Sequence, residues 1–251
     1  DWIEELIQAF IAAAKMAADA GFDMVDIAHC HGEFAHELLS ARTRPGGFGG
    51  SLANRTLFLR RVVAGIRRQT PNLLIGVRLS AFDVVPHTAG PDGVGRPADF
   101  ASLLPYRWGF GLDPANPLQI DLAEPREFVR ICREIGVVAV NVTAGSPYYS
   151  PHVQRPASTP ADGDYAPPED PLASFCRLLN VAGELKSHRP ELAFVGSGFS
   201  CLHDYLPHVA QWAVAQRKLD FVGLGRMALC YWQLPADLML GRPVQIARIC
   251  R

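Results

Sequence analysis

The chain has 251 residues, in which 24 lysines and arginines stand against 25 aspartates and glutamates, for a formal net charge of −1. This near-neutral balance argues against nucleic acid as a partner, because binding to phosphates needs an excess of basic side chains. Hydrophobic residues make up 49% of the chain, as in an ordinary globular protein. No stretch approaches the roughly 20 consecutive apolar residues of a membrane span, so no membrane partner is expected.

Six cysteines are scattered along the chain without CxxC spacing. In a chain of this length they are typical of reduced, mostly buried thiols rather than of a disulfide framework or a zinc ribbon. The sequence begins without a basic segment followed by an apolar run, which is the pattern of a signal peptide. We therefore expect a cytoplasmic protein.

Helical and strand patterns alternate along the chain. Apolar side chains at helical spacing predict helices over residues 2–19, 51–69, 125–135, 171–187 and 202–216, followed by a short terminal helix. Apolar runs predict strands over residues 24–28, 73–79, 137–142, 192–195 and 221–224. Two proline-rich excursions from the core are expected at about residues 81–122 and 143–170.

Five strand–helix units in this order predict an α/β fold with a parallel sheet and right-handed crossovers. Two architectures fit: an open doubly wound sheet, or part of a (β/α)₈ barrel (TIM barrel). The GxGxxG fingerprint of the doubly wound dinucleotide fold is absent. We favour a single partial barrel domain over residues 1–251. It would hold about the last five βα units, with about three strands missing on the N-terminal side.

The last two strands end in short glycine turns, Gly196-Ser197-Gly198 and Gly223-Leu224-Gly225-Arg226. Backbone N–H groups of such turns bind anions, and paired phosphate-binding turns after the seventh and eighth strands are usual in barrels. An arginine adds a guanidinium suited to bidentate phosphate contact. The alternative is that these glycines only permit tight turns.

Arg78 stands near the C-terminal end of an otherwise apolar strand. An unpaired charge there is costly, and the C-terminal rim is where barrels bind their ligands. Arg78 is therefore either a ligand-binding residue or one half of a structural ion pair.

The first strand ends in Ala28-His29-Cys30-His31-Gly32-Glu33. In an extended chain His29 and His31 would point to one side, as in the metal pair of a zinc-dependent amidohydrolase-like barrel. The later strand ends supply no further histidine or aspartate ligands, so we expect no metal. Two interpretations of these histidines remain: an imidazole that donates a hydrogen bond to a bound anion or carbonyl, or a histidine that packs in the core.

A further glycine turn, Phe48-Gly49-Gly50, leads into Ser51-Leu52-Ala53-Asn54-Arg55, where Ser51 is a plausible N-cap. By itself this run indicates structure rather than catalysis. Together with His31-Gly32, Val77-Arg78-Leu79-Ser80 and the two terminal glycine turns, however, it resembles the old yellow enzyme family of NADH:flavin oxidoreductases, in a branch similar to 2,4-dienoyl-CoA reductase. The similarity spans the chain but only the last five-eighths of the family's barrel.

The resemblance implies an FMN-binding barrel that passes hydride from NAD(P)H through the flavin to a small-molecule acceptor such as an electrophilic alkene or enone. By position, Arg78 would face the pyrimidine edge of the flavin. Gly196, Ser197, Gly198, Gly225 and Arg226 would hold the phosphate. His31 falls where the family binds the substrate carbonyl, and His29 is a possible substitute for a second histidine, since Ala28 stands at that place.

One departure concerns catalysis, because Glu33 replaces the family's proton-donating tyrosine. A carboxylate donates a proton only if its surroundings keep it protonated; Tyr148 or Tyr149 are alternatives. A non-catalytic barrel fragment or pseudoenzyme is therefore the competing hypothesis. Some relatives carry an iron–sulfur cluster just beyond this region, so one is possible only in a longer chain. The sequence does not indicate the oligomeric state.

Overall fold

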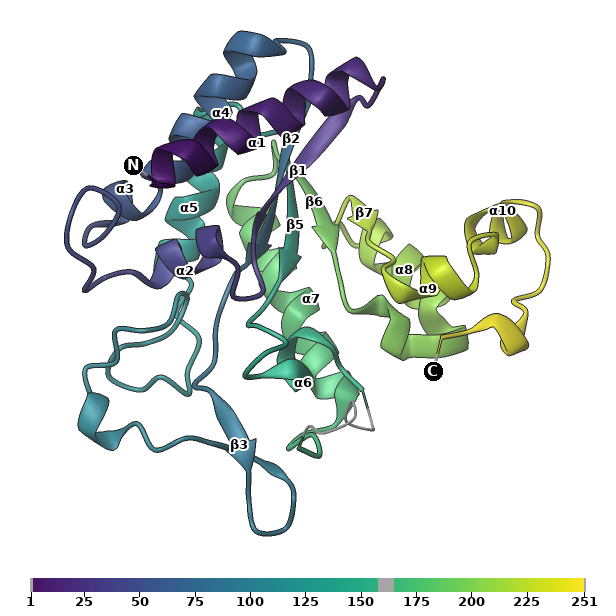
Figure 1. Ribbon diagram of the computed structural model, residues 1–251. Helices are drawn as coiled ribbons and strands as arrows, with labels where there is room; N and C mark the ends of the chain where they lie inside the picture. Colours follow the sequence, from purple (N-terminus) through teal and green to yellow (C-terminus); the bar gives the residue numbers. More distant parts are fainter. Residues whose placement is uncertain (1, 158–164, 251) are drawn as a thin grey trace.

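A computed structural model describes residues 2–157 and 165–250 of the chain (Figure 1). Its centre is a five-stranded parallel sheet made of β1 (Met24–His29), β2 (Leu74–Ser80), β5 (Ala139–Thr143), β6 (Ala193–Gly196) and β7 (Phe221–Val222). The strands lie in the order β1-β2-β5-β6-β7, so each pairs with the next parallel strand along the chain. A doubly wound sheet reverses its strand order at a switch point, whereas a barrel never does. The strand order therefore confirms the expectation of a partial barrel.

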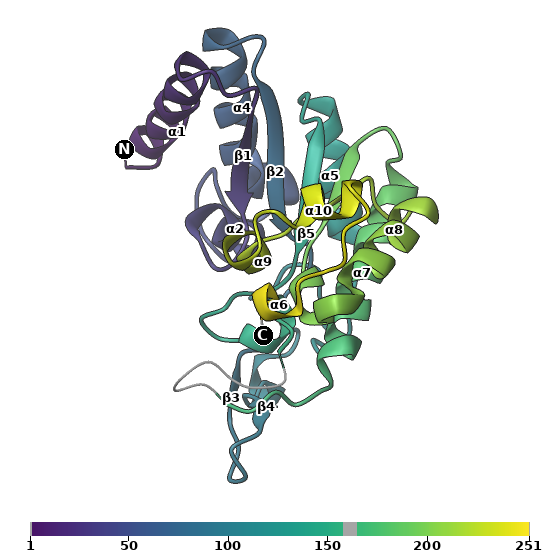
Figure 2. The same ribbon diagram turned by 90° about the vertical axis from the view of Figure 1, so that its right-hand side faces the viewer.

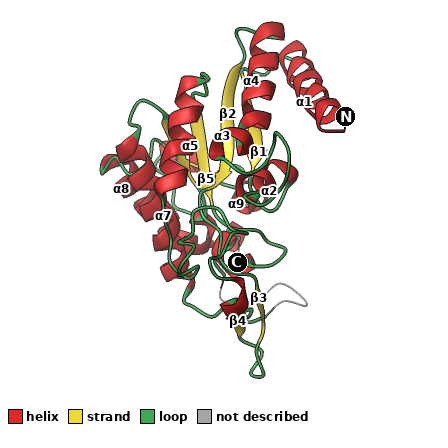
Figure 3. Cartoon of the chain, turned by 90° about the vertical axis from the view of Figure 1, so that its left-hand side faces the viewer, coloured by secondary structure: helices red, strands yellow, loops and turns green. Residues whose placement is uncertain are grey.

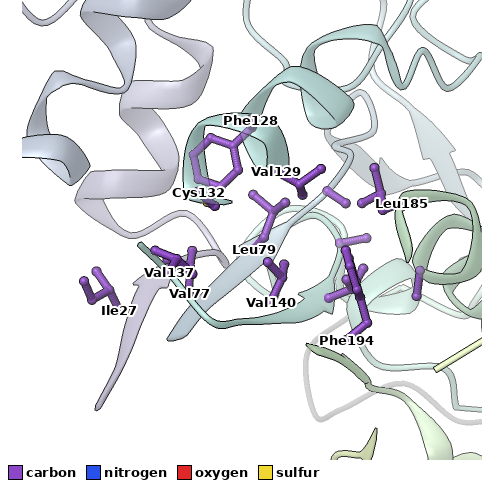
Figure 4. Packing of buried hydrophobic residues seen from close by; sticks show 14 of the residues in the cluster. Ile27, Val77, Leu79, Phe128, Val129, Cys132, Val137, Val140, Leu185 and Phe194 are labelled. Atoms are coloured by element: carbon purple, nitrogen blue, oxygen red, sulfur yellow. The ribbon is translucent and has the colours of Figure 1, made fainter. Parts of the chain in front are cut away.

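Helices cover one face of this sheet, as Figure 3 shows. They are α1 (Trp2–Asp19), α4 (Leu57–Gln69), α5 (Ala123–Glu134), α7 (Pro171–His188) and α8 (Leu206–Ala215). Alternate residues of the strands point into this layer. Ile27, Val77, Val140 and Phe194 belong there to the same buried cluster as Phe128, Val129 and Leu185 of the helices (Figure 4). Burial of these side chains is the main stabilising contribution to the fold.

The other strand residues line the opposite, inner face of the sheet. The strand register places Arg78 beside Asn141, Asn141 beside Val195, and Asp26 beside Gly76. Polar side chains thus gather on the inner face. Because parallel strands end at the same edge of a sheet, the segments that follow them converge at its carboxyl edge.

Both excursions leave from that carboxyl edge, at the lower end of Figure 1. The first contains an antiparallel hairpin of β3 (His87–Ala89) and β4 (Gly95–Pro97) and a short 3₁₀ turn, η1 (Ala101–Leu103). The second contains α6 (Pro151–Gln154), and its residues 158–164 lie outside the described part of the chain. The two excursions contact each other, since His87 N–H donates to Tyr149 O and Gly95 N–H donates to Ala166 O.

The structure corrects several details of the predicted elements. A helix that the sequence did not predict, α2 (Phe34–Ser40), follows the first strand. The helix expected from Ser51 is divided into α3 (Leu52–Arg55) and α4. The helix expected at 202–216 is divided into a 3₁₀ segment, η2 (Phe199–Tyr205), and α8. The terminal part forms α9 (Arg226–Cys230), α10 (Leu234–Met239) and η3 (Ile246–Arg248), seen in yellow in Figure 2.

The expectation that the cysteines are mostly buried is wrong, because only Cys30 and Cys132 are buried, whereas Cys176 and Cys230 are exposed. Within the described residues, no helix is both long enough and apolar enough to span a membrane.

Candidate active site

A cleft of about 460 Å³ lies at the carboxyl edge of the sheet, between the ends of β2, β5, β6 and β7. It receives residues from two strands, from the turns after β6 and β7, and from the second excursion. These lining residues are Arg78, Asn141, Thr143, Pro147, Gln154, Arg155, Pro156, Ser197, Gly198, Ser200, Gly223, Leu224, Gly225 and Arg226.

The two glycine turns are tied to one another and to the sheet. Gly223 N–H donates to Gly196 O over 2.8 Å, and Ser197 Oγ donates to Val142 O over 2.6 Å. Gly198 has φ +86°, a left-handed conformation that favours glycine. Gly225 has open space where a Cβ would stand, so its backbone is accessible. Gly196 differs, because it is absent from the cleft lining and its missing Cβ makes room for Leu219 of the core.

The guanidinium groups of Arg155 and Arg226 lie in the same cleft, which Arg78 also lines. Partial burial, followed by the charge of Arg155, lowers the pKa of Arg226. No carboxylate is found among the described residues that line the cleft. Like charges held close together without a counter-ion repel each other, and a bound anion would relieve that repulsion.

Arg78 is half-buried on the inner face, and its Nε has no hydrogen-bond partner among the described residues. The same is true of Oδ1 of Asn141, its neighbour in the register. Asp26 is near enough for the charge of Arg78 to act on it. Burial raises the pKa of Asp26, while its hydrogen bond from Asn141 and the charge of Arg78 oppose the rise. Over the described ranges Arg78 forms no ion pair within 4.0 Å, so the hypothesis that it is one half of a structural ion pair is wrong.

His31 lies at the end of β1 in a left-handed conformation with φ 62°. Its Nε2 is 3.1 Å from Thr143 Oγ1, and Thr143 lines the cleft. Its backbone N–H donates to Ser80 Oγ, and its carbonyl accepts from Ser146 Oγ. Burial, then the charge of Arg78, lowers the pKa of His31 to about 4, so the imidazole is neutral at pH 7.

The structure does not bring His29 to this site. Its side chain is 2% exposed and packs near Phe58 and Phe128 on the helix-covered face of β1. Burial lowers the pKa of His29 to about 3. The expectation that His29 and His31 point to one side is wrong, because the extended strand ends before His31. Among the described residues, no three histidine, cysteine or acidic side chains form a group that would hold a metal ion.

Glu33 is exposed at the start of α2, where its backbone N–H donates to Cys30 O. Glu33 is therefore open to solvent and is not enclosed by the site. Tyr148 lies beside the His31-Gly32 turn, since one of its ring carbons is 3.6 Å from the place of a Cβ on Gly32, but its side chain is 81% exposed.

The Gly49–Arg55 run has a structural role, as its pattern indicates. Ser51 Oγ accepts from Asn54 N–H and caps α3, and Asn54 Nδ2 donates to Gly49 O. Arg55, 3% exposed, donates to Gly50 O and Leu39 O and forms an ion pair with Glu124. These bonds fix the loop between α2 and α4 onto the start of α5.

Sequence reasoning missed several residues of the cleft, among them Asn141, Thr143 and Arg155. Asn141 carried a signal, because it is a polar residue inside the apolar strand 137–142. Thr143 and Arg155 carried none, since threonine is common in strands and Arg155 lies in an irregular excursion.

Comparisons with known proteins agree with this geometry. Residues 1–100 match the NADH:flavin oxidoreductase / NADH oxidase family. An NADPH dehydrogenase of Clostridium acetobutylicum is 43% identical over 84 residues, which are 32% of this chain and 25% of that relative. A metal reductase of Desulforamulus reducens is 26% identical over 246 residues, which are 97% of this chain and 29% of that relative.

Among solved structures, a complex of 2-naphthoyl-CoA reductase with 2-naphthoyl-CoA superposes with a TM-score of 0.65 at 22% identity. The superposition covers 96% of this chain and 30% of that protein. The chain thus spans less than a third of the length of each of these three relatives. The structural likeness confirms the α/β fold as part of a (β/α)₈ barrel. The sequence matches confirm the family resemblance, which the family model supports over residues 1–100.

Proposed function

We propose that this chain is the FMN-binding part of an oxidoreductase of the old yellow enzyme type. It would transfer hydride from NAD(P)H to an electrophilic alkene or enone. The family match of residues 1–100 supports this proposal, as does the polar cleft at the carboxyl edge of the sheet. That edge is where barrel enzymes hold their cofactors and substrates.

The cleft has the donor set that FMN requires. Ser197, Gly198, Gly225 and Arg226, with Arg155, would hold the phosphate through backbone N–H groups and guanidinium hydrogen bonds. Nε of Arg78 and Oδ1 of Asn141 are a donor and an acceptor without partners among the described residues, and they suit the polar edge of a flavin ring. When bound, FMN supplies the transfer of hydride from NAD(P)H to the acceptor. Gly196 would support the turn from inside the core.

His31 would orient the acceptor. Because its imidazole is neutral at pH 7 and one ring nitrogen faces Thr143, the other ring nitrogen is available to a carbonyl or an anionic group. Arg78 would place a fixed positive charge beside the reacting centre, which stabilises negative charge as it develops. We assign no proton transfer to Glu33 or Tyr148, because both residues are exposed.

The observation that carries the proposal is the pair of guanidinium groups of Arg155 and Arg226 in a cleft whose described lining residues include no carboxylate. A fluorescence titration of the protein with FMN, and in parallel with riboflavin, tests it directly. We expect FMN to bind more than tenfold more tightly than riboflavin, because only FMN carries the phosphate. Equal affinities would contradict the phosphate assignment.

The exposure of Glu33 favours a second candidate, a barrel that binds flavin without turning over an acceptor. The two candidates differ in one result. The enzyme's bound flavin is reoxidised by an enone under anaerobic conditions, whereas that of a non-catalytic barrel stays reduced.

A further inference from the structure

Another histidine lies behind the turn that carries His31. His36 belongs to α2, and its side chain is 1% exposed. The Gly32 backbone N–H donates to its Nδ1 over 2.9 Å, and its Nε2 lies 3.2 Å from Oδ1 of Asp83. His31 and Gly32 both have positive φ values, 62° and 77°. A left-handed conformation at a non-glycine residue such as His31 persists only when its surroundings hold it.

Asp83 is itself fixed by several donors. Its side chain is 5% exposed, and Oδ2 accepts from Phe110 N–H over 2.8 Å and from Ser40 Oγ over 3.3 Å. The carboxylate thus joins α2 to the first excursion, and it presents its other oxygen to His36. The contact with Nε2 of His36 is within ion-pair distance but lacks hydrogen-bond geometry, so the buried carboxylate favours a hydrogen on Nε2 through its charge.

These contacts determine where the proton of neutral His36 lies. Nδ1 accepts the Gly32 N–H, so it carries no hydrogen, and the hydrogen is on Nε2, facing Asp83. We propose that His36 is a positioning residue for His31. Its Nε2–H tautomer, oriented by Asp83, accepts the Gly32 amide and keeps the His31-Gly32 turn in the conformation that directs His31 toward Thr143.

Protonation of His36 would break this arrangement. An imidazolium has no lone pair on Nδ1, so the Gly32 N–H would lose its acceptor. Burial opposes protonation, but the charge of Asp83, followed by the charges of Glu37 and Glu33, raises the pKa of His36 above its ordinary value. The other titratable groups that face His36 or Asp83 come from β1, the first excursion and the second: His29, His31, Tyr106 and Tyr149. The turn is therefore held at alkaline pH and released as the pH falls through the pKa of His36.

Two variants separate the two ring nitrogens. In His36→Asn, the amide oxygen stands near the place of Nδ1 and can accept the Gly32 N–H. In His36→Gln, the amide stands near the place of Nε2 and can reach only Asp83. Both variants remove the titration. A role in packing alone would affect the two variants alike, whereas the proposed role separates them.

The readout is nuclear magnetic resonance of ¹⁵N-labelled histidine side chains across pH 5 to 9, which needs neither flavin nor activity. In the unmodified protein we expect His36 in the Nε2–H tautomer, and a His31 signal that shifts as His36 protonates. His36→Asn should keep the alkaline His31 signal at all pH values, and His36→Gln should displace it at all pH values. An Nδ1–H tautomer of His36 would overturn the proposal even if neither variant folds, and so would equal His31 signals in the two variants.

The inference rests on the proposed function only for the role of His31 as acceptor-binding residue. In the oxidative half-reaction, we expect His36→Gln to lose about tenfold in rate and His36→Asn to lose much less. The reason is that a displaced His31 imidazole binds the acceptor in a less favourable geometry, although the imidazole itself is still present. If FMN fails to bind while the tautomer and the His31 signals are as expected, the proposed function fails and the positioning role stands.

Discussion

His31 and Thr143 face each other across the carboxyl ends of β1 and β5, with 3.1 Å between Nε2 and Oγ1, although β2 lies between their strands. The contact places a neutral imidazole of the His31-Gly32 turn beside the lining of the cleft. It also leaves the second ring nitrogen for a ligand.

His31→Ala should slow the reoxidation of the reduced enzyme by an enone acceptor much more than its reduction by NADPH. The reason is that His31 would touch the acceptor and not the nicotinamide. We expect a loss of about 100-fold in the oxidative half-reaction, as for other positioned hydrogen-bond donors. Anaerobic stopped-flow measurement of the two half-reactions separates these effects, and equal losses in both would count against the acceptor role.

Arg226→Ala should weaken the binding of FMN by about 10- to 100-fold, the value of a charge-assisted hydrogen bond to a phosphate. Riboflavin binding should not change, because riboflavin lacks the phosphate. Arg68→Ala is a matched control, since Arg68 is exposed near the end of α4 and is absent from the cleft lining. An unchanged FMN affinity in Arg226→Ala would refute the phosphate assignment.

Arg55→Ala should destabilise the fold by about 3 kcal/mol, because it leaves the carbonyls of Leu39 and Gly50 and the carboxylate of Glu124 without their common donor. The exposed ion pair of Arg61 with Glu4 provides the comparison, and Arg61→Ala should leave the urea midpoint nearly unchanged. Similar midpoints for the two variants would show that the Gly49–Arg55 run is not a structural clamp.

The protein should lose stability in acid through the histidines whose pKa values are lowered by burial, whereas the raised pKa of His36 acts in the opposite direction. The pKa of His29 is about 3 in the folded chain, so the unfolded chain binds the proton more tightly. The contribution of neutral His29 to the free energy of unfolding is then fully present above the ordinary histidine pKa of about 6.5. Below that pH it falls by up to about 1.4 kcal/mol per pH unit. The lowered pKa values of His31 and His152, both about 4, act in the same direction.

His29→Leu removes one of these titrating groups and places an apolar side chain in the same part of the core. Urea unfolding at pH 7, 6 and 5 should therefore show a smaller loss of free energy in this variant than in the unmodified protein. Parallel losses in the two proteins would show that His29 does not stay neutral in the fold.

The strand–helix order was predictable because most strand residues are apolar, and only isolated polar residues interrupt the apolar runs. The run 137–142 is apolar except for Asn141, and Gly21 and Gly198 mark ends of elements. The helix α2 was hidden for a local reason. Its N-cap is Glu33, which forms no capping hydrogen bond, so the chain shows none of the usual start signals for the apolar residues Phe34, Leu38 and Leu39.

The site was predictable only where a residue type is informative by itself. Arg78 in an apolar strand and the two glycine turns are such cases. The contacts of His31 were not, because its left-handed conformation depends on Ser80, Ser146 and His36, which are distant in sequence or lie in an unpredicted helix. For the same reason strand alternation failed to separate His29 in the core from His31 at the cleft.

The proposed function requires that this protein hold a flavin that NAD(P)H reduces. A visible absorption spectrum of the purified protein, recorded anaerobically with FMN and then after addition of NADPH, tests this requirement. We expect a protein-bound flavin band that NADPH bleaches and an enone restores. A spectrum of free FMN, unchanged by the protein and not bleached faster than in its absence, would contradict the proposed function.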